Sequence, residues 1–365
     1  MNNPFPKFLQ RMHSCLFSEV DEPLSEISNI HREIALIFDL LRPDDFLIDR
    51  IGSCGPGRPK LDRGALVRAF VAKAYLNIST TSLLLERLQF DGVLRRLCGW
   101  FARREVPCES TFSNAFSEFS TSQKFNDAHD ALVSRHFKDT LIFHISRDST
   151  AIEAREKKVV VAEPVEQKKF PRGRPRLGEE RPTKELKRLE KQPTQSLAEM
   201  LNDLPVHCDS GAKTNSKGHA MYWNGYKLHL DICDGGIPIS AILTSASVHD
   251  SQVAIPLEEM TSQKVTSLYS LMDAAYDCDA IKTFIGSKGK KAIADSKKKR
   301  GEEEPVPLEP CDKQRFKART TVERTYSDLK DNHGGRNVRV KGGAKVFAHL
   351  MAGVVAITAK MILRL

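Results

Sequence analysis

Hydrophobic residues in the first 138 positions recur at helical spacing, with short polar breaks between the runs. Phe112, Phe116 and Phe119 follow one another at i, i+4 and i+7, which places the three rings on one face of a helix. The hydroxyl-bearing run 79–82 precedes a leucine-rich stretch and suits a helix N-cap. The pattern predicts an all-α N-terminal domain over residues 1–138. Its short basic helices fit a helix-turn-helix-like DNA-binding unit, although a small basic bundle without that role fits equally well.

The hydrophobic pattern changes at residue 139, where continuous apolar runs replace helical periodicity. Residues 141–147 form such a run and end at Asp148, and residues 267–272 end in the same way at Asp273. A continuous apolar run that ends in an acid is typical of a buried strand with a functional residue at its exit. The pattern therefore predicts two buried strands whose terminal carboxylates are candidates for chemistry, or simple strand-end caps.

Between these runs, residues 225–233 alternate apolar and polar side chains, which predicts a half-buried strand. The Asp-Gly-Gly sequence 234–236 predicts a hairpin turn to a returning strand over 237–244. A helix over 251–260 and a short edge strand over 290–295 follow. Residues 139–365 thus predict an α/β catalytic domain, with a mixed sheet flanked by helices.

Residues 153–215 interrupt this domain and are rich in Lys, Glu, Pro and Gln, which predicts an insertion or long exposed loop. Arg172 and Arg174 lie within it in a Pro-Arg-Gly-Arg-Pro sequence, and Arg58 lies in a similar Gly-Arg-Pro turn near the N-terminus. Such extended cationic segments can lie along a DNA minor groove. A solvated basic loop is the alternative.

Residues 316–330 contain no Gly or Pro and predict one helix. At about 100° per residue, Phe316, Arg319, Glu323 and Lys330 fall on one stripe, beside an apolar face. A solvated helix with an Arg–Glu pair is the simplest interpretation of this segment alone. If the strands that end at Asp148 and Asp273 pair in parallel, however, both carboxylates lie at the same edge of the sheet. A helix packed on that sheet can then bring Glu323 to them as a third carboxylate.

Three carboxylates that close together repel one another unless cations neutralise them. Mg²⁺ or Mn²⁺ is the oxygen-seeking ion that such a cluster holds, and two ions about 4 Å apart suit in-line phosphoryl displacement. No Gly-x-Ser-x-Gly sequence, Walker A loop or Gly-rich dinucleotide fingerprint occurs in the chain. The rival acids are Asp231, Asp277 and Asp279.

Charge and composition favour an anionic partner. The formal net charge is +9, and residues 282–345 hold 18 Lys and Arg against 9 Asp and Glu, so this window carries the whole excess. Lys227 is a further candidate for DNA contact.

The eight cysteines include no Cys-x-x-Cys pair, which disfavours a structural zinc site. No secretory signal is visible, and residues 346–365 predict a core helix, not a membrane span; we expect a cytoplasmic protein.

Several sequence blocks together resemble bacterial insertion-sequence transposases with a DDE, RNase H-like catalytic domain. The blocks are Asp148-Ser149-Thr150, 225–229, 247–250 and 272–277, and the helices up to Phe119 resemble the N-terminal domain of many such proteins. The helix 316–330 resembles the family's Y-(2)-R-(3)-E-(6)-K element in its spacing, with Phe316 in place of Tyr. That exchange removes a hydroxyl but keeps an aromatic ring.

The resemblance implies that Asp148, Asp273 and Glu323 are a catalytic, metal-binding triad, and that Arg319 and Lys330 contact DNA. It implies metal-dependent cleavage at the ends of a mobile element, followed by strand transfer into target DNA. A homodimer or larger assembly on double-stranded DNA, in a bacterial nucleoid, follows from the same resemblance. The alternatives are a non-catalytic DNA-binding regulator derived from a transposase and an unrelated RNase H-like nuclease.

Overall fold

The structure is a computed structural model that describes residues 27–43, 47, 61–159, 186–214, 218–295 and 307–365. The N-terminal part of this description is entirely helical, as the spacing of its hydrophobic residues predicts. Its helices are α2 (Asn29–Leu41), α3 (Arg63–Tyr75), α4 (Thr81–Phe90), α5 (Gly92–Cys98), the 3₁₀ turn η2 (Arg103–Glu105), α6 (Glu109–Thr121) and α7 (Lys124–Phe137). Thr80 caps α4 by accepting the backbone N–H of Leu83, which confirms the predicted N-cap.

Aromatic side chains hold these helices together. Phe112 and Phe119 of α6 and Phe125 of α7 surround Phe70 of α3, with ring centroids 5.6 to 6.3 Å apart and mostly edge-to-face. The predicted aromatic face of α6 is therefore the core of this region. Arg95 is fully buried and donates to the carbonyl oxygen of Leu88, so one arginine of these basic helices belongs to the core.

Within the described residues, six strands form one mixed sheet. They are β1 (Leu141–Glu153), β2 (Asp209–Thr214), β3 (Ala220–Cys233), β4 (Pro238–Ser245), β5 (Thr266–Met272) and β6 (Lys291–Ala294). β1 lies at the centre, antiparallel to β3 and parallel to β5. β4 pairs antiparallel with β3, and β6 pairs parallel with β5 at the edge. β2 joins the outer part of β3 to form a hairpin.

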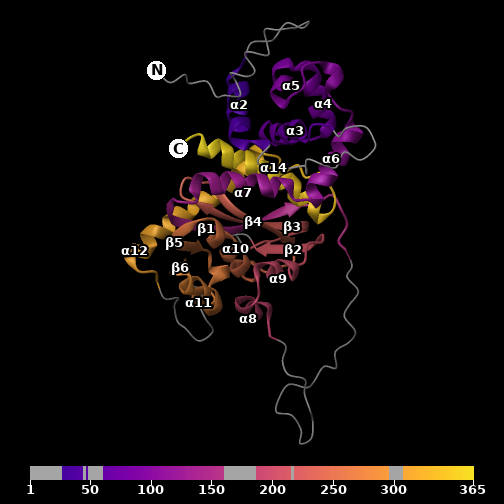
Figure 1. The fold of residues 1–365 in the computed structure, drawn as a ribbon. Coiled ribbons are helices and arrows are strands. Elements are labelled where there is room, and N and C mark those ends of the chain that lie inside the picture. Colours follow the sequence, from indigo (N-terminus) through magenta and orange to yellow (C-terminus); the bar gives the residue numbers. More distant parts are fainter. Residues whose placement is uncertain (1–26, 44–46, 48–60, 160–185, 215–217, 296–306) are drawn as a thin grey trace, which may run out of the picture.

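Helices cover both faces of this sheet (Figure 1). Between β1 and β2 lie α8 (Arg188–Lys191), η3 (Gln192–Thr194) and α9 (Leu197–Asn202), and between β4 and β5 lies α10 (Ser251–Lys264). Between β5 and β6 lie η4 (Ala274–Tyr276) and α11 (Asp279–Ser287), and after β6 come α12 (Pro310–Phe316), η5 (Lys317–Arg319), α13 (Thr320–Asn332) and α14 (Gly343–Ile362). α7 and α14 lie between the sheet and the N-terminal helices, while α8 to α11 lie on the opposite side (Figure 1). The predicted class, α/β with an all-α N-terminal region, is confirmed.

α14 is the element that joins the two parts of the molecule. It packs against α3, α6 and α7 as well as β4 and α13, so one continuous hydrophobic core runs from the N-terminal helices to the sheet. By length and composition alone this helix is apolar enough to cross a membrane, but 72% of its most apolar window is buried inside the protein. The predicted core helix over 346–365 is thus confirmed, while the domain boundary at 138/139 stays a prediction.

Four local predictions differ from the structure. β1 does not end at Asp148 but continues to Glu153, because it keeps pairing with β3 as far as Gly225. The segment 153–215 is not only an exposed loop, since its described part contains α8, α9 and β2. β3 is buried on both faces from Gly225 onward except at Lys227, because α10 covers its second face.

The fourth difference concerns the helix predicted over 316–330. α12 ends at Phe316, one 3₁₀ turn follows, and α13 begins at Thr320. The carbonyl oxygen of Ala318 accepts the hydroxyls of Thr321 at 2.5 Å and Ser146 at 3.4 Å. Hydroxyl donors at a backbone acceptor can compete with the regular helical bonds, and both contacts lie at the point where the 3₁₀ turn gives way to α13.

Candidate active site

Asp148 and Asp273 lie on neighbouring parallel strands, as the sequence predicts. The register pairs Arg147 of β1 with Met272 of β5, so each aspartate directly follows one member of the pair. Asp273 leaves the end of β5 and caps η4, where its carboxylate accepts the backbone N–H of Ala275 at 2.8 Å. Asp148 instead lies inside β1, opposite Leu230 of β3.

The Asp148 carboxylate is largely buried, with 15% of its side chain exposed. It accepts the backbone N–H of Ser149 at 2.8 Å and a guanidinium N–H of Arg319 at 2.8 Å. Burial nevertheless raises the pKa of Asp148 to about 6, and the negative charge of Asp273 adds to that rise. The two donors and the charge of Lys213 oppose the shift without cancelling it. Asp148 is therefore a carboxylate whose ionised form lacks sufficient positive charge around it.

Glu323 lies on the first turn of α13, with 63% of its side chain exposed. Arg319 connects it to the sheet, because one Nη atom lies 3.4 Å from Glu323 Oε1 and the other lies 2.8 Å from Asp148 Oδ2. Within the described ranges, no group of three or more His, Cys, Asp or Glu side chains is gathered closely enough to hold a metal ion. The predicted metal triad thus stays a prediction, and a guanidinium lies between two of its members.

Tyr326 fixes α13 over this site. Its hydroxyl donates to the carbonyl oxygen of Asp148 at 2.6 Å and accepts the backbone N–H of Leu230 at 3.0 Å. The side chain is buried together with Val322 and Leu329 of the same helix. Sequence periodicity places Tyr326 on the apolar face, but it does not reveal that the hydroxyl bonds to the backbone of β1 at Asp148.

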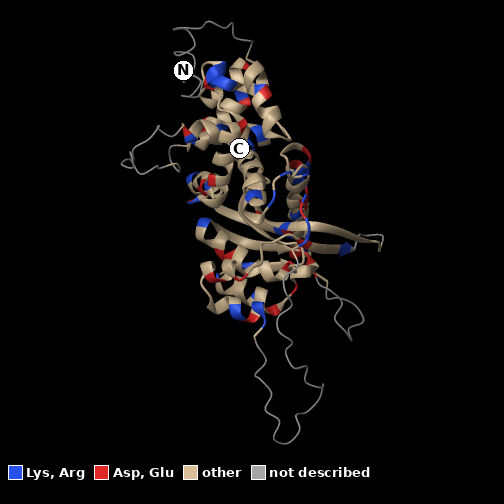
Figure 2. Ribbon diagram, turned by 90° about the vertical axis from the view of Figure 1, so that its right-hand side faces the viewer, with Lys and Arg blue, Asp and Glu red and all other residues tan. Residues whose placement is uncertain are grey.

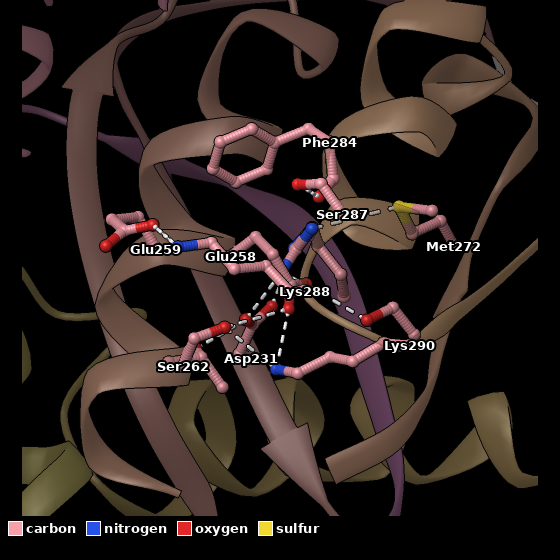
Figure 3. A network of polar contacts seen from close by, with 12 residues as sticks. Asp231, Glu258, Glu259, Ser262, Met272, Phe284, Ser287, Lys288 and Lys290 are labelled. Carbon is pink, nitrogen blue, oxygen red and sulfur yellow. Dashed lines mark hydrogen bonds and ion pairs between the residues drawn. The ribbon is translucent and has the colours of Figure 1, made fainter. Parts of the chain in front are cut away.

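A buried ion network around Arg147 lies on the face of β1 opposite to Asp148, because neighbouring residues of a strand point to opposite faces. Figure 3 shows Asp231, Glu258 and Lys290 of this network. Arg147 donates to both carboxylate oxygens of Asp231, at 2.8 and 2.7 Å, and to Glu258 of α10 at 2.9 Å. Lys290 lies 2.8 Å from the second oxygen of Glu258, and all four side chains are nearly or fully buried. This network ties β1, β3 and α10 together at the register position that precedes both aspartates. Asp231, an alternative candidate for the metal-binding acids in the sequence, accepts hydrogen bonds from Arg147 within this network.

The remaining candidates differ in their accessibility. Lys227 is 15% exposed and donates to Asp250 at 3.0 Å and to the carbonyl oxygen of Val248 at 2.9 Å, so its charge is already paired. Lys330 is half-buried, and burial together with Arg336 lowers its pKa. Asp277 pairs with Lys282 at 2.5 Å. Arg58, Arg172 and Arg174 lie outside the described residues.

Charged residues in the described part of the chain are interspersed in sign. Figure 2 shows basic and acidic segments side by side along the helices and at the sheet. Part of the basic window 282–345 lies outside the described ranges. The positive charge that acts on Asp148 comes from individual residues, namely Arg319 and Lys213.

The order β4–β3–β1–β5–β6, with one aspartate on β1 and the other directly after β5, is the arrangement of the RNase H-like class. The family model described as "Transposase DDE domain" matches residues 148–359, more than half of the chain, and "Transposase domain (DUF772)" matches residues 20–118. The chain belongs to the DDE transposase family. Searches of curated proteins and of solved structures returned no match. The family generally uses divalent metal ions and acts on DNA.

Proposed function

We propose that this chain is a catalytically active transposase that cleaves DNA at the ends of an insertion sequence and joins the freed 3′-hydroxyl to target DNA. The observation that carries the proposal is the placement of Asp148 on β1 and of Asp273 at the end of the parallel strand β5, with Arg319 of η5 bridging Asp148 to Glu323 of α13. These residues lie within the matched DDE domain. Cleavage of two element ends in one event further implies at least a dimer on DNA.

The residues present fit a hard divalent cation. Asp148 and Asp273 offer carboxylate oxygens, the ligands that Mg²⁺ and Mn²⁺ prefer, and the raised pKa of Asp148 marks a place where added positive charge is favourable. Asp148, Asp273 and Glu323 would hold the metal, as two ions in the full site. When bound, such ions polarise the phosphate and stabilise its attacking and leaving oxygens.

The chain's own residues supply the rigidity and the positive charge. Tyr326 and the Arg147 network hold β1 from its two faces, which fixes the backbone of Asp148. Arg319 bridges Asp148 and Glu323, and in our proposal Arg319 and Lys330 contact DNA phosphates. In our proposal Arg58, Arg172 and Arg174 extend this contact along the duplex.

The experiment uses duplex DNA that carries the sequence flanking the coding region, including any short inverted repeats. We expect the protein to nick this DNA at the repeat ends only when Mg²⁺ or Mn²⁺ is present. Glu323→Gln should abolish nicking and leave DNA affinity nearly unchanged, because the exchange removes a ligand charge from an exposed side chain. Glu118→Gln is the matched control, since Glu118 is also an exposed acid paired with an arginine, Arg63.

Two results would contradict parts of this proposal. Undiminished nicking by Glu323→Gln would exclude that residue from the catalytic set. Specific binding of the ends without metal-dependent nicking would instead support the non-catalytic regulator, which the Arg319 bridge between Asp148 and Glu323 also favours. Nicking without strand transfer to a target duplex would identify a nuclease.

A further inference from the structure

The hairpin of β2 and β3 exposes two large apolar side chains near its tip. Met221 and Tyr222 are 61% and 79% exposed, whereas β3 from Gly225 onward is largely buried. Their cross-strand partners are Lys213 and Ala212, and the small side chain of Ala212 cannot cover the Tyr222 ring. Two adjacent residues of this kind leave apolar surface in water on both faces of a hairpin.

The neighbouring aromatic residue shows that the hairpin does not need this exposed pair for its own folding. Trp223 lies over Gly211 of β2, where a side-chain carbon would come within 2.4 Å of the indole ring. Its indole N–H also donates to the carbonyl oxygen of Tyr226 at 3.2 Å. Trp223 therefore packs the two strands together, while Met221 and Tyr222 remain available for a partner.

The same hairpin carries positive charge toward the catalytic acids. Lys213 is exposed, and its ammonium lies near enough to lower the pKa of Asp148 and of Lys330. Glu153 at the end of β1 also lies within electrostatic range of Lys330. Lys213 of β2 is thus a cation within electrostatic range of both Asp148 and Lys330 of α13.

We propose that the β2–β3 hairpin is a DNA-contact element in which Tyr222 stacks on a base of the end DNA while Lys213 pairs with the phosphate backbone. This inference rests on the proposed function. Bases offer flat apolar faces to aromatic side chains, and phosphates offer charge to lysines, so the two features of the hairpin match one DNA strand. Neither feature alone defines that partner.

The test compares DNA affinities of the full chain by fluorescence anisotropy, with end DNA that carries a fluorescent base analogue near the nick. Tyr222→Ser should weaken binding roughly tenfold or more, because base stacking on an aromatic residue contributes that much. Tyr222→Phe should bind within about twofold of the wild type, since it keeps the ring. Phe143→Ser is the control, because Phe143 is 58% exposed at the opposite end of the sheet.

Charge is tested separately through salt dependence. Lys213→Ala should lower the slope of log affinity against log salt concentration by about 0.9, the loss of one phosphate contact. Lys138→Ala, an exposed lysine at the end of α7, should leave the slope unchanged. All these side chains are exposed, so thermal unfolding should confirm that the variants fold as the wild type does.

The outcomes separate this inference from the function on which it rests. If the wild type does not bind end DNA at all, both are overturned. If the wild type binds and Tyr222→Ser binds equally well, with an unchanged signal from the base analogue, only the role of the hairpin is overturned. A fall in oligomeric state on sedimentation, without loss of DNA affinity, would assign the hairpin to contact with a second copy of the chain.

Discussion

Replacement of Asp148 by Asn should stabilise the protein above neutral pH. The folded state raises the pKa of Asp148 from 3.8 to about 6, so it binds this proton more tightly than the unfolded chain does. When the pKa of an acid is higher in the folded protein than in the unfolded chain, its ionisation lowers the free energy of unfolding. This loss is absent below the pKa of the unfolded chain and is complete once the pH has risen through the pKa of the folded protein. Asn mimics the protonated carboxyl and avoids that cost.

The magnitude follows from the size of the pKa change. One pKa unit corresponds to about 1.4 kcal/mol, so ionisation of Asp148 costs the folded state about 3 kcal/mol at a pH well above 6. The side chain is 15% exposed, which makes this an upper value. Because a whole domain is stable by about 5–15 kcal/mol, a difference of this size is readily measured.

The assay is urea unfolding of the wild type and Asp148→Asn with a chelator present. At about pH 8 the variant should be more stable by as much as 3 kcal/mol, and the difference should vanish at about pH 4. Addition of Mg²⁺ should stabilise only the wild type. Asp209→Asn is a control of opposite sign, because a hydrogen bond from the Ser247 hydroxyl lowers the pKa of Asp209 to about 2. A variant less stable than the wild type at pH 8 would refute the reasoning.

Two further exchanges test the supports of β1. Glu258→Gln should cost about 3–5 kcal/mol in urea unfolding, because it leaves Arg147 and Lys290 with one buried acid fewer. The pKa of Glu258 is about 2, despite burial, so this stability should be present above pH 4.5 and be lost as pH falls toward 2. Tyr326→Phe should cost about 1–3 kcal/mol, because the backbone N–H of Leu230 loses its acceptor. It should also slow nicking, and equal stability of that variant would show that water replaces the hydroxyl.

Most strands and turns of the sheet could be predicted from the sequence, because each is indicated by a short local pattern of residues. The apolar runs before Asp148 and Asp273 indicate buried strands, and the Asp-Gly-Gly turn indicates the hairpin between β3 and β4. Their parallel pairing was a hypothesis from that pattern, and the register of β1 with β5 confirms it.

The features that could not be predicted from the sequence depend on contacts between residues far apart in the chain. The full length of β1 depends on its pairing with Gly225, which the local run of residues does not contain. Asp231 alternates as an exposed residue would, yet it is buried because Arg147 and Thr261 supply hydrogen bonds from other elements. At the break before α13, the carbonyl oxygen of Ala318 likewise accepts a hydroxyl from Ser146, more than 170 residues away.

The packing of α14 bears on how this protein is made. During translation, α3, α6 and α7 leave the ribosome long before residues 343–362, yet α14 fills the space that those three helices share. A nascent chain therefore completes its N-terminal core only after almost all of the catalytic sheet has been synthesised. A copy of the gene interrupted before Gly343 should yield no well-folded helical fragment, and so no shortened competitor for the full-length protein.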